Sequence, residues 1–529
     1  MSSPRYYRPA QPVPADAPPL TADLCIYGAN AAGIMAAVQA RRLGLSVTLL
    51  EPSAEIGGLT SGGLSFTDLG NADAIGGLAR EFYRRVGAHY GSEINFAFEP
   101  HVARKVLDGF LREAGVTAEC GQYVASARCE RDSEGAPRIV ELTTTSGLRV
   151  RAAYFIDCSY EGDLMAAAGA SFTVGREARS TYNEVFNGQQ IHASHQFAMR
   201  IDPYVKPGDP RSGLLPGIDT DDTFVPGSGD RRVQAYNFRV CMTKNPANRV
   251  PFPQPAGYRR NDYELLARVL AAGWSEVFQK FDRIRGEKTD TNNHGPVSTD
   301  FIGQNWAWPT ADYATREKLF QAHVTYQQGY HWFMANDPAV PAPFRSAYAE
   351  WGLAADEFTD TGHWPHQLYV REARRLVGHV VMTSAHCLSR ETVDDVIGLG
   401  AYQMDSHNCR RLVHAGCVLN EGDVQVKLPK PYGISYRAIV PRAGECANLL
   451  VPVCASASHI AYGSIRMEPV FMTLAQSAVI AASVALQRNR CAVQTVPYLE
   501  LKPRLEQARQ VVSWDPTRLN GLTGNPVKE

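Results

Sequence analysis

Two glycines and a glutamate near the start of the chain have the spacing of a phosphate-binding turn. Gly28 and Gly33 directly follow the apolar residues 23–27, and Glu51 ends a second apolar run 23 residues beyond Gly28. The N-terminus of a helix presents unpaired N–H groups and a partial positive charge, so a glycine turn that leads into a helix can bind phosphate. A carboxylate at the end of the next strand accepts hydrogen bonds from a ribose. These residues therefore predict a dinucleotide site.

The elements around these residues support that interpretation. Residues 23–27 predict a short strand, the alanine-rich stretch up to Leu43 predicts a helix, and residues 46–50 predict a second strand. A βαβ unit of about 30 residues is the size of a dinucleotide-binding half. Asn30 replaces the middle glycine of the GxGxxG motif, which weakens the motif taken alone. The alternative is that the glycines serve only packing, but the strand, helix, second strand and terminal acid together favour a dinucleotide.

Two further stretches favour a flavin over a nicotinamide cofactor. Residues 56–63 form a second glycine-rich segment five residues after Glu51, placed to lie along a cofactor beyond its pyrophosphate. Residues 155–163 form an apolar strand that runs into a turn of small residues. Nicotinamide-binding domains of this fold do not need either stretch, so both point to FAD.

Composition excludes several classes of protein. The chain has 529 residues, 53 basic and 54 acidic side chains and a formal charge of −1, so it lacks the positive field of a nucleic-acid-binding protein. Its 11 cysteines form no CxxC pair and no zinc-like cluster, so no metal site is expected. Scattered, unpaired cysteines favour reduced thiols and a cytoplasmic location.

Two segments need a separate interpretation. The first 20 residues hold six prolines and lack the apolar stretch of a secretory signal, which predicts a polyproline-like or disordered arm. Residues 469–487 carry no charge and approach the length of a membrane-spanning helix. Their polar residues and many alanines, with Arg466 and Glu468 alongside, favour a helix buried inside the protein and no membrane partner.

The chain divides into five stretches that differ in composition and in the pattern of apolar residues. A second strand-and-helix signature begins at residues 448–453, so the two ends of the chain are expected to form one unit. The middle is irregular and rich in aromatic residues, proline, asparagine and aspartate. We therefore expect an α/β Rossmann-like FAD-binding domain, with a central parallel sheet and helices on both sides, and an inserted α+β substrate domain. The expected boundaries are an arm at 1–20, the FAD-binding domain at 21–175 and 441–490, the inserted domain at 176–440 and an extension at 491–529.

At this point the sequence resembles a known family, the FAD-dependent oxidoreductases of the glutathione-reductase-like flavoprotein superfamily, in a group with largely unassigned substrates. The resemblance extends over residues 22–490. It rests on the blocks GANAAGIMAA, EPSAEIGGLTSGGLSFTDLG, FEPHVARKVL, FIDCSYEGDLMAAAGASFTVGRE, NFRVCMTKNPANRVPFP, STDFIGQNWAWP, WPHQLYVREARRLVG, MDSHNCRR and SASHIAYGSIRMEPVFMTLAQSA. Blocks in this order are specific for the family and not for a substrate.

The resemblance implies roles for residues in three blocks. Around the first turn and the second strand, the implied FAD contacts are Gly28, Asn30, Ala31, Gly33, Glu51 and Pro52. In the second glycine-rich stretch they are Gly57, Gly58, Leu59, Thr60, Ser61 and Gly62. After the later strand they are Asp157, Cys158, Ser159, Gly162 and Asp163. Cys158 stands where alanine is expected, and a small buried side chain is favoured over a redox role because no second cysteine lies nearby.

The C-terminal block is expected to approach the reacting end of the flavin. It is similar to the loop of fumarate-reductase-like flavoproteins that contains small residues, histidine and arginine. By that comparison, the residues that line the isoalloxazine ring are Gly463, Ser464, Arg466, Met467 and Glu468. The long helix that follows has an N-terminus that stabilises negative charge on a reduced flavin.

Oxidation of a C–H bond next to an oxygen needs a base for the hydroxyl proton, and neutral imidazole suits that role at pH 7. The candidate catalytic residues are His459 and His407, with Arg466 facing the substrate, and His363 and His366 stand behind them. Three arginines are expected in one short helical stretch, where they either bind substrate oxygens or form ion pairs, the latter being favoured: Arg371, Arg374 and Arg375. The many aromatic residues in the middle of the chain favour a carbohydrate or polyol substrate, because sugar rings stack on aromatic faces.

The sequence thus predicts a flavoprotein oxidoreductase, a dehydrogenase or oxidase that takes a hydride from a CH–OH group, or less favourably a CH–NH group, of a small polar substrate. No second dinucleotide fingerprint for NAD(P)H is visible, so O2 or another external acceptor is preferred. Two alternatives stay open. One is a flavin monooxygenase or double-bond reductase that uses NAD(P)H, and the other is a flavin-binding protein without catalysis.

Overall fold

The computed structural model describes residues 4–133 and 135–518. It contains two main units, and the first is built on a seven-stranded sheet. The strand order is β3-β2-β1-β6-β5-β4, and β20 also pairs with β6. β1, β2, β3, β6 and β20 pair in parallel, whereas β4 and β5 join antiparallel. The strands are β1 (Leu20–Tyr27), β2 (Val47–Glu51), β3 (Ala118–Cys120), β4 (Val124–Arg131), β5 (Pro137–Thr144), β6 (Arg149–Asp157) and β20 (Leu449–Leu450).

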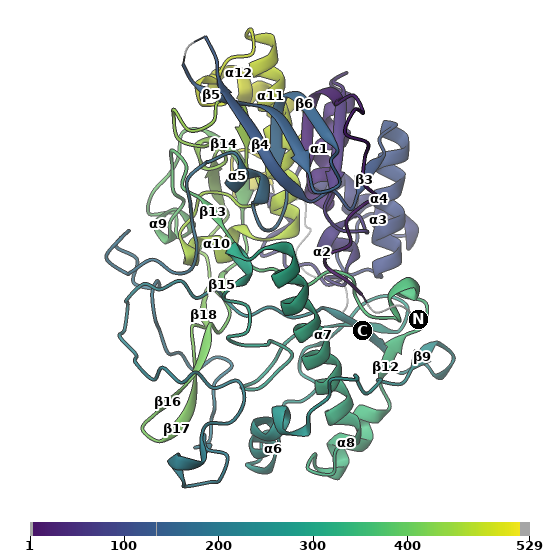
Figure 1. Cartoon of the computed structure of the whole chain (residues 1–529), viewed down its shortest axis with the longest axis vertical. Helices are drawn as coiled ribbons and strands as arrows, with labels where there is room; N and C mark the ends of the chain where they lie inside the picture. Colours follow the sequence, from purple (N-terminus) through teal and green to yellow (C-terminus); the bar gives the residue numbers. More distant parts are fainter. Residues whose placement is uncertain (1–3, 134, 519–529) are drawn as a thin grey trace.

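Helices cover this sheet because alternate strand residues are apolar on both faces. Leu24 and Ile26 of β1 share one core with the long helices, whereas Cys25 and Tyr27 share another with Leu164, which lies in the short helix α5. Figure 1 shows the long helices beside the sheet in the upper half of the molecule. The helices are α1 (Ala31–Arg42), α3 (Gly77–His89), α4 (Pro100–Ala114), α5 (Asp163–Ala167), α11 (Glu468–Gln487) and α12 (Tyr498–Gln507). This is the expected α/β Rossmann-like fold.

Helix α11 is the one segment, among the described residues, that is long and apolar enough to cross a membrane. Its mean hydropathy is 1.7, but 94% of its 18-residue apolar window is buried inside the protein. It packs against α1, α3, α12 and strand β14 (Val396–Gly400). Alanines on α1 and α11 have no bulk beyond Cβ, so the two helices can pack closely. The prediction of a helix buried inside the protein is confirmed.

The two ends of the chain meet in this unit. Strand β20 adds to the sheet beside β6, and the Asn448 side chain just before it accepts a hydrogen bond from the Ile139 N–H at 2.8 Å. The same side chain donates to the Ile139 and Ala153 carbonyls at 2.9 and 3.0 Å. One buried amide therefore joins the late strand to β5 and β6.

A second unit, which we call the cap, is built around an antiparallel sheet of order β10-β11-β8-β12-β9. Its strands are β8 (Val240–Thr243), β9 (Arg249–Val250), β10 (Phe281–Arg283), β11 (Lys288–Thr291) and β12 (Gly352–Ala354). Its helices are α6 (Glu264–Ala271), α7 (Tyr313–Asn336) and α8 (Ala342–Ala349), in the lower half of Figure 1.

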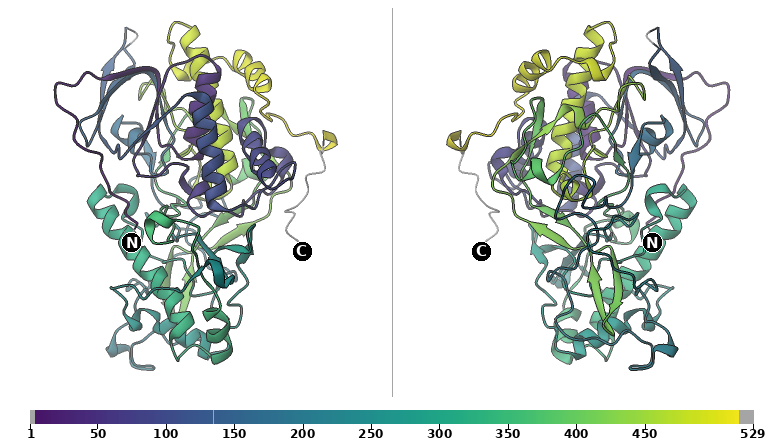
Figure 2. Two further views of the ribbon diagram at one scale, coloured as in Figure 1. Left: turned by 90° about the vertical axis from the view of Figure 1, so that its right-hand side faces the viewer. Right: turned by 90° about the vertical axis from the view of Figure 1, so that its left-hand side faces the viewer.

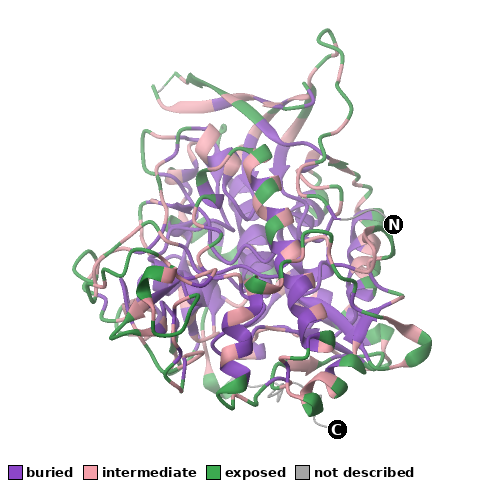
Figure 3. Cartoon of the chain, turned by 60° about the horizontal axis from the view of Figure 1, so that its bottom comes forward, coloured by how far each residue is buried: buried purple, intermediate pink, exposed green. Residues whose placement is uncertain are grey.

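Four short strand pairs connect the cap to the rest of the chain. They are β7 (Phe172–Thr173) with β13 (Arg375–Leu376), β14 with β19 (Tyr432–Ser435), β15 (Met404–Ser406) with β18 (Val424–Val426), and β16 (Arg410–His414) with β17 (Cys417–Glu421). Three short helices complete the parts used below, α2 (Gly58–Ser61), α9 (Ser384–Cys387) and α10 (His459–Ile465). Figure 3 shows buried residues running through the middle of the molecule and exposed ones on its outer loops.

A buried ion pair of the cap also contacts the unit built on the seven-stranded sheet. Arg239 donates to both oxygens of Asp290 at 2.7 and 2.8 Å, and both side chains are buried. One Asp290 oxygen also accepts from the backbone N–H groups of Ser65 and Phe66, which follow the second glycine-rich stretch. Because the carboxylate is paired and fully hydrogen-bonded, its burial is tolerated and it holds the two units in register.

The proline-rich arm was predicted to be polyproline-like or disordered, and the structure agrees with the first of these alternatives in having no helix or strand. Residues 4–19 lack helix or strand, but they are fixed against the protein rather than disordered. The Ala10 and Val13 N–H groups donate to the carbonyls of Gly121 and Ser146 at 2.9 and 2.7 Å. The part of the arm nearest its start lies beside helix α7, as Figure 2 shows. Prolines favour an extended chain, and here neighbouring polar groups supply the hydrogen bonds that such a chain lacks internally.

A difference from the prediction concerns the three arginines of residues 371–375. No helix forms there, because the chain runs extended into the two-residue strand β13. Each guanidinium is paired with a different carboxylate: Arg371 with Asp300, Arg374 with Asp163, and Arg375 with Glu372 and Glu177. The predicted helix was wrong, whereas the favoured interpretation as ion pairs is confirmed.

Candidate functional site

The turn between β1 and α1 has the geometry that its glycines suggest. Gly28 has a φ of 99°, and a Cβ there would lie 2.8 Å from the backbone of Cys158 and Ser159. A Cβ on Gly33 would lie 1.8 Å from the Gly28 carbonyl oxygen. Both positions therefore require glycine, because the turn, the helix and the end of β6 touch through their backbones.

Asn30 at the middle position of the motif links the same parts by hydrogen bonds. Its Oδ1 accepts from the Gly33 N–H at 3.0 Å and caps α1, and its Nδ2 donates to the Cys158 carbonyl at 2.6 Å. A glycine could make neither bond. The departure from the GxGxxG pattern therefore stabilises this turn, and Ala31 begins the helix directly after it.

Glu51 lies at the end of β2 as expected and is 7% exposed. Its carboxylate accepts from the Ala29 N–H at 2.6 Å and the Ser53 N–H at 2.8 Å, and Pro52 is half-buried beside it. Burial raises the pKa of Glu51 to about 6, despite these hydrogen bonds that favour the ionised form. An acceptor at this place is suited to ribose hydroxyl groups.

The second glycine-rich stretch folds back onto the first. Gly57 and Gly58 have φ of 93° and 54°, and the Gly57 N–H donates to the Ala29 carbonyl at 2.8 Å. The Leu59 N–H donates to the Tyr160 hydroxyl at 3.0 Å. A Cβ on Gly62 would lie 2.5 Å from the Cβ of Gln367 in the cap. Gly58 of this stretch and residues 159–160, which are far apart in sequence, thus line one hollow.

Glu468 at the start of α11 joins this assembly. Its carboxylate accepts from the Thr60 hydroxyl at 2.6 Å and the Tyr160 hydroxyl at 2.8 Å. Burial raises the pKa of Glu468 to about 7, and the two hydrogen bonds only partly offset that effect. Ser61 is engaged nearby through a bond from its hydroxyl to the Ile56 carbonyl at 2.8 Å. The beginning of α11 is therefore fixed to the second glycine-rich stretch.

The turn after β6 is held by its own side chains. Asp157 accepts from the Ser159 N–H and hydroxyl and from the Met165 N–H, and burial raises its pKa to about 6. Cys158 is fully buried, and burial raises the pKa of its thiol. Its predicted place as a small buried side chain is confirmed.

Two predicted cofactor residues of this turn have other partners. Gly162 has a φ of 67° and begins α5. Asp163 pairs with Arg316 at 2.6 Å and Arg374 at 2.7 Å, and these arginines lower the pKa of Asp163 against the opposing effect of burial. Asp163 thus joins the cap to the sheet in this structure.

These motifs line one hollow of about 40 Å³. Residues of the dinucleotide motifs form one side of it, namely Gly28, Asn30, Glu51, Pro52, Ser53, Gly58, Ser159, Tyr160 and Glu161. The other side comes from the arm and the cap, namely Arg5, Tyr6, Phe320, His366, Gln367 and Leu368. The free N–H groups at a helix start, the acceptor at Glu51 and the glycines without Cβ fit the phosphates, ribose and close backbone approach of FAD. The small volume shows that arm and cap side chains lie directly against these motifs.

His459 is a buried side chain with both ring nitrogens engaged. Nδ1 lies 2.7 Å from Glu372 Oε2, and Nε2 lies 2.8 Å from the Ser406 hydroxyl. Burial, with Arg375 as a smaller cause, lowers the pKa of His459 to about 3. Its backbone N–H donates to Glu177 at 2.9 Å. This geometry joins α10 to β15 and leaves no ring nitrogen for a substrate proton.

His407 has a different environment. Its Nδ1 lies 2.8 Å from Asp300 Oδ2, and Asp300 in turn pairs with Arg371 at 2.9 Å. Nε2 lies 3.3 Å from Asp405 Oδ2 and interacts with that carboxylate. Although burial acts to raise it, the pKa of Asp300 falls to about 2 because of Arg371 and His407. The ring is therefore oriented through Nδ1, and Nε2 faces a carboxylate on the opposite side.

Arg466 completes this cluster. It donates to Asp405 Oδ2 at 3.0 Å and to the Tyr369 hydroxyl at 2.7 Å, while its Nε has no partner among the described residues. Arg371 and Arg466 both lie over the Tyr369 ring, 4.6 and 5.6 Å from its centre. Burial opposes the change, but His407 and Arg466 lower the pKa of Asp405. We call Asp300, Tyr369, Arg371, Asp405, His407 and Arg466 the charged cluster.

The charged cluster has a partly exposed side. Asp405 is partly buried, as are Asp68 and Tyr402, whose charges interact with it. Burial raises the pKa of Asp68 against the effect of Arg239. Tyr436 lies outside the cluster and donates to the Val493 carbonyl at 2.7 Å.

Sequence reasoning missed Asp300, Tyr369 and Asp405 as members of this site. Asp300 and Asp405 lie inside the blocks STDFIGQNWAWP and MDSHNCRR. Asp405 and His407 are two residues apart at the end of β15, a spacing that places side chains on one face of a strand. That spacing was a usable signal, whereas nothing in sequence pairs Asp300 with His407.

Gly463 and Ser464 take part in packing. A Cβ on Gly463 would lie 2.6 Å from the Asp405 carbonyl oxygen, so α10 rests directly on β15. The Ser464 hydroxyl donates to the Tyr402 carbonyl and accepts from Tyr432. Met467 precedes α11 and is buried. Of the C-terminal block, Arg466 reaches the charged cluster and Glu468 reaches the glycine-rich stretch.

The other histidines and the aromatic residues lie elsewhere. His366 lines the hollow, and burial lowers its pKa to about 4, whereas His363 contacts the Glu357 carbonyl at 3.2 Å. The tryptophans Trp308 and Trp364 are buried in the cap. Most aromatic residues in the middle of the chain thus pack in a hydrophobic core. They therefore give less support to a carbohydrate substrate than the sequence suggested.

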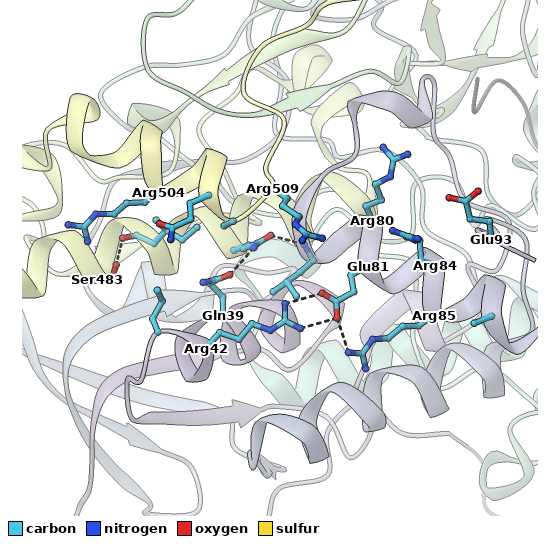
Figure 4. Close-up of a pocket in the computed structure, with 18 of the residues that line it drawn as sticks. Gln39, Arg42, Arg80, Glu81, Arg84, Arg85, Glu93, Ser483, Arg504 and Arg509 are labelled. Atoms are coloured by element: carbon cyan, nitrogen blue, oxygen red, sulfur yellow. Dashed lines mark hydrogen bonds and ion pairs between the residues drawn. The ribbon is translucent and has the colours of Figure 1, made fainter. Parts of the chain in front are cut away.

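Two other features are separate from the charged cluster. Glu99, His101, Asp356 and Glu357 group like metal ligands, but the ammonium of Lys288 lies 2.7–2.8 Å from three of their carboxylates and already balances them. A groove of about 1430 Å³ lies between α1, α3, α11 and α12 and is lined by six arginines and two glutamates. Figure 4 shows Glu81 in this groove between Arg42 and Arg85.

Comparison with known proteins decides the family. The family model described as FAD dependent oxidoreductase matches residues 23–505. The chain belongs to this family. The description of this family names FAD, so we assign FAD as the cofactor. No curated protein matches the chain significantly.

Solved structures resemble this FAD dependent oxidoreductase only in part. AlpK has 21% identity over 30% of this chain and 35% of its own, with a TM-score of 0.23. THI4 of Thermovibrio ammonificans has 19% identity over 29% of this chain and 64% of its own, with a TM-score of 0.22. OxyS anhydrotetracycline hydroxylase from Streptomyces rimosus has 19% identity over 36% of this chain and 39% of its own, with a TM-score of 0.23. The chain thus spans less than two thirds of each of these proteins.

Proposed function

We propose that this FAD dependent oxidoreductase oxidises a CH–OH group of a small polar substrate and that His407 accepts the hydroxyl proton. One observation carries the proposal, namely the orientation of His407 by Asp300, whose Oδ2 lies 2.8 Å from Nδ1. Of the two histidines favoured from sequence, His459 has both ring nitrogens hydrogen-bonded to buried protein groups, whereas Nε2 of His407 lies 3.3 Å from the partly exposed Asp405 carboxylate. The geometry therefore supports His407 as the base and His459 as a residue that positions β15.

Bound FAD supplies an acceptor for the hydride that leaves the substrate carbon. Removal of the hydroxyl proton at His407 Nε2 makes that departure easier, because negative charge builds on the oxygen. Asp300 fixes the proton on Nδ1 and stabilises the imidazolium that results. Arg371 in turn keeps Asp300 ionised, so at neutral pH its carboxylate can stabilise positive charge on the His407 ring.

Arg466 and Tyr369 suit the binding of substrate oxygens. The Nε of Arg466 has no partner among the described residues, and its two other nitrogens are held by Asp405 and Tyr369. A guanidinium fixed in this way offers a directed donor to a hydroxyl or carboxylate group. The partly exposed Asp68, Tyr402 and Asp405 mark the side from which a small polar molecule reaches the charged cluster.

The first test is flavin reduction by candidate substrates. The purified protein is titrated anaerobically with sugars, polyols, hydroxy acids, amino acids and NADPH, and the flavin absorption near 450 nm is followed. Bleaching by one alcohol class supports the proposal and names the substrate. Bleaching by NADPH alone contradicts it and indicates a monooxygenase or double-bond reductase, and a flavin that no compound reduces indicates a protein without catalysis.

A variant pair then tests the base. His407→Asn should slow flavin reduction by that substrate by about 100-fold or more, the range for lost general-base catalysis. His414→Asn is the matched control because His414 is an exposed histidine on the neighbouring strand β16. Equal rates in His407→Asn and the wild type would remove His407 from the reaction, while FAD content checks that both variants are loaded.

A further inference from the structure

The arm carries a charged side chain into the cofactor hollow. Arg5 and Tyr6 line it together with Gly28, Asn30 and Glu51 of the dinucleotide motifs. Neither arm residue belongs to the stretch matched by the family model, which begins at residue 23. The contact is therefore a property of this chain that family membership does not supply.

The arm is fastened on both sides of the hollow. The N–H groups of Tyr6 and Tyr7 donate to Glu317 of α7 at 2.8 and 2.7 Å, and the Arg8 N–H donates to the Tyr123 hydroxyl at 3.0 Å. The Tyr6 ring packs edge-on against Trp308, with 4.8 Å between the ring centres. The arm therefore bridges the cap and the sheet across the opening.

Aromatic packing continues along the arm. The Tyr7 ring stacks on Tyr313 with 5.6 Å between centres, and the Tyr6 hydroxyl accepts from Arg316 at 3.1 Å. Both partners belong to α7. Because these contacts fix residues 6 and 7, the neighbouring Arg5 is held at the edge of the hollow.

The charge balance of the hollow makes Arg5 distinctive. Among the described residues that line it, Arg5 is the one side chain that is a cation at every working pH. His366 also lines the hollow, but burial lowers its pKa to about 4, so it is neutral at pH 7. Glu51 and Glu161 are acids, with pKa raised by burial to about 6 and about 7. A cofactor pyrophosphate bound in the hollow would therefore lie near two acids, backbone N–H groups and the one cation, Arg5.

Arg5 itself is free to serve an anion. It is exposed, and no ion pair or side-chain hydrogen bond holds it among the described residues. A guanidinium binds phosphate oxygens in a bidentate manner and with charge assistance. We infer that Arg5 contacts the pyrophosphate of bound FAD and that the arm closes the adenosine half of the site, slowing release of the cofactor. This inference rests on FAD binding and is independent of the proposed substrate reaction.

The test compares release of FAD from holoenzyme variants. Arg5→Ala should release flavin faster by roughly tenfold, the effect of one lost charge-assisted hydrogen bond. Arg8→Ala is the matched control, because Arg8 is also an exposed arginine of the arm and its backbone contact survives the change. Release is followed as flavin fluorescence after dilution, at 0.05 and 0.5 M NaCl, and the difference between wild type and Arg5→Ala should shrink at high salt.

A second measurement separates a phosphate contact from a change in arm packing. After FAD has been released from each protein, ADP and adenosine are tested as competitors of FAD rebinding. Loss of ADP competition in Arg5→Ala with adenosine competition unchanged supports the inference. Equal release rates in Arg5→Ala and the wild type, the same increase in Arg8→Ala, or equal losses for ADP and adenosine would each overturn it.

Discussion

Asp300 Oδ2 lies 2.8 Å from Nδ1 of His407, although the two residues are 107 positions apart in sequence. Asp300 follows β11 in the cap, and His407 follows β15 of a short two-stranded sheet, so two separate segments contribute the pair. The carboxylate also pairs with Arg371, which comes from a third segment. Docking of these segments therefore determines whether a histidine ring is oriented for proton transfer.

Asp300→Asn should slow flavin reduction by about 100-fold while leaving FAD bound. The amide can still contact Nδ1, but it cannot stabilise the imidazolium or balance the buried Arg371. Stopped-flow reduction with the substrate found by titration measures the rate, and absorption at 450 nm measures FAD content. Rates within threefold of the wild type would show that Asp300 serves structure alone.

His459→Gln separates positioning from catalysis. Both ring nitrogens of His459 hold protein partners, so the variant should lose about 1–3 kcal/mol of unfolding free energy through the affected hydrogen bonds. Flavin reduction should fall by less than tenfold, far less than in His407→Asn. Urea unfolding and stopped-flow reduction on the same preparations give the two quantities. A large loss of rate with unchanged stability would return His459 to the role of base.

The first βαβ unit was predictable because local patterns determine it. Gly28, Gly33 and Glu51 occupy their expected places, and α1 and β2 end within a few residues of the prediction. The buried nature of α11 also followed from its alanines and scattered polar residues. In these elements, the periodicity of apolar residues and the turn chemistry agree with the fold.

The charged cluster was only partly predictable because long-range docking creates it. His407 and Arg466 were candidates by residue type, but Asp300 and Tyr369 join them through segments that no local pattern connects. The contacts of the arm were not predictable for a related reason. Its prolines predict an extended chain, whereas the ordered state depends on partners such as Glu317 and Tyr123.

Gly33→Ala should remove the dinucleotide site. The new Cβ would lie 1.8 Å from the Gly28 carbonyl oxygen, so α1 must move away from the turn. We expect loss of bound FAD and destabilisation of about 1–3 kcal/mol or more, the range for overpacking. Gly109→Ala in α4 is the matched control, because the nearest atom to its Cβ would be 3.7 Å away and alanine favours a helix. Flavin content and thermal unfolding report both effects, and a flavin-loaded Gly33→Ala protein would contradict the assigned turn.

Acid should destabilise the protein below pH 6.5 through its buried histidines, and His331 offers a clean test. Burial lowers the pKa of His331 in the folded state to about 3, whereas an unfolded histidine titrates near 6.5. As pH falls below 6.5, the unfolded state therefore takes up the proton first, and unfolding free energy is lost until pH approaches 3. Each such group contributes up to about 1.4 kcal/mol per pH unit.

His331→Phe removes the group that takes up a proton on unfolding. It keeps an aromatic ring against Phe252, whose ring centre lies 5.1 Å from that of the imidazole. The variant loses the contact between Nδ1 and the Tyr348 hydroxyl, so its stability at pH 7.5 should fall modestly. Between pH 6.5 and 5, its unfolding free energy should decline less steeply than that of the wild type, by up to about 1.4 kcal/mol per unit. Urea unfolding at several pH values gives both slopes. Parallel slopes would mean that His331 titrates normally in the folded protein, so that burial in the cap does not hold it neutral.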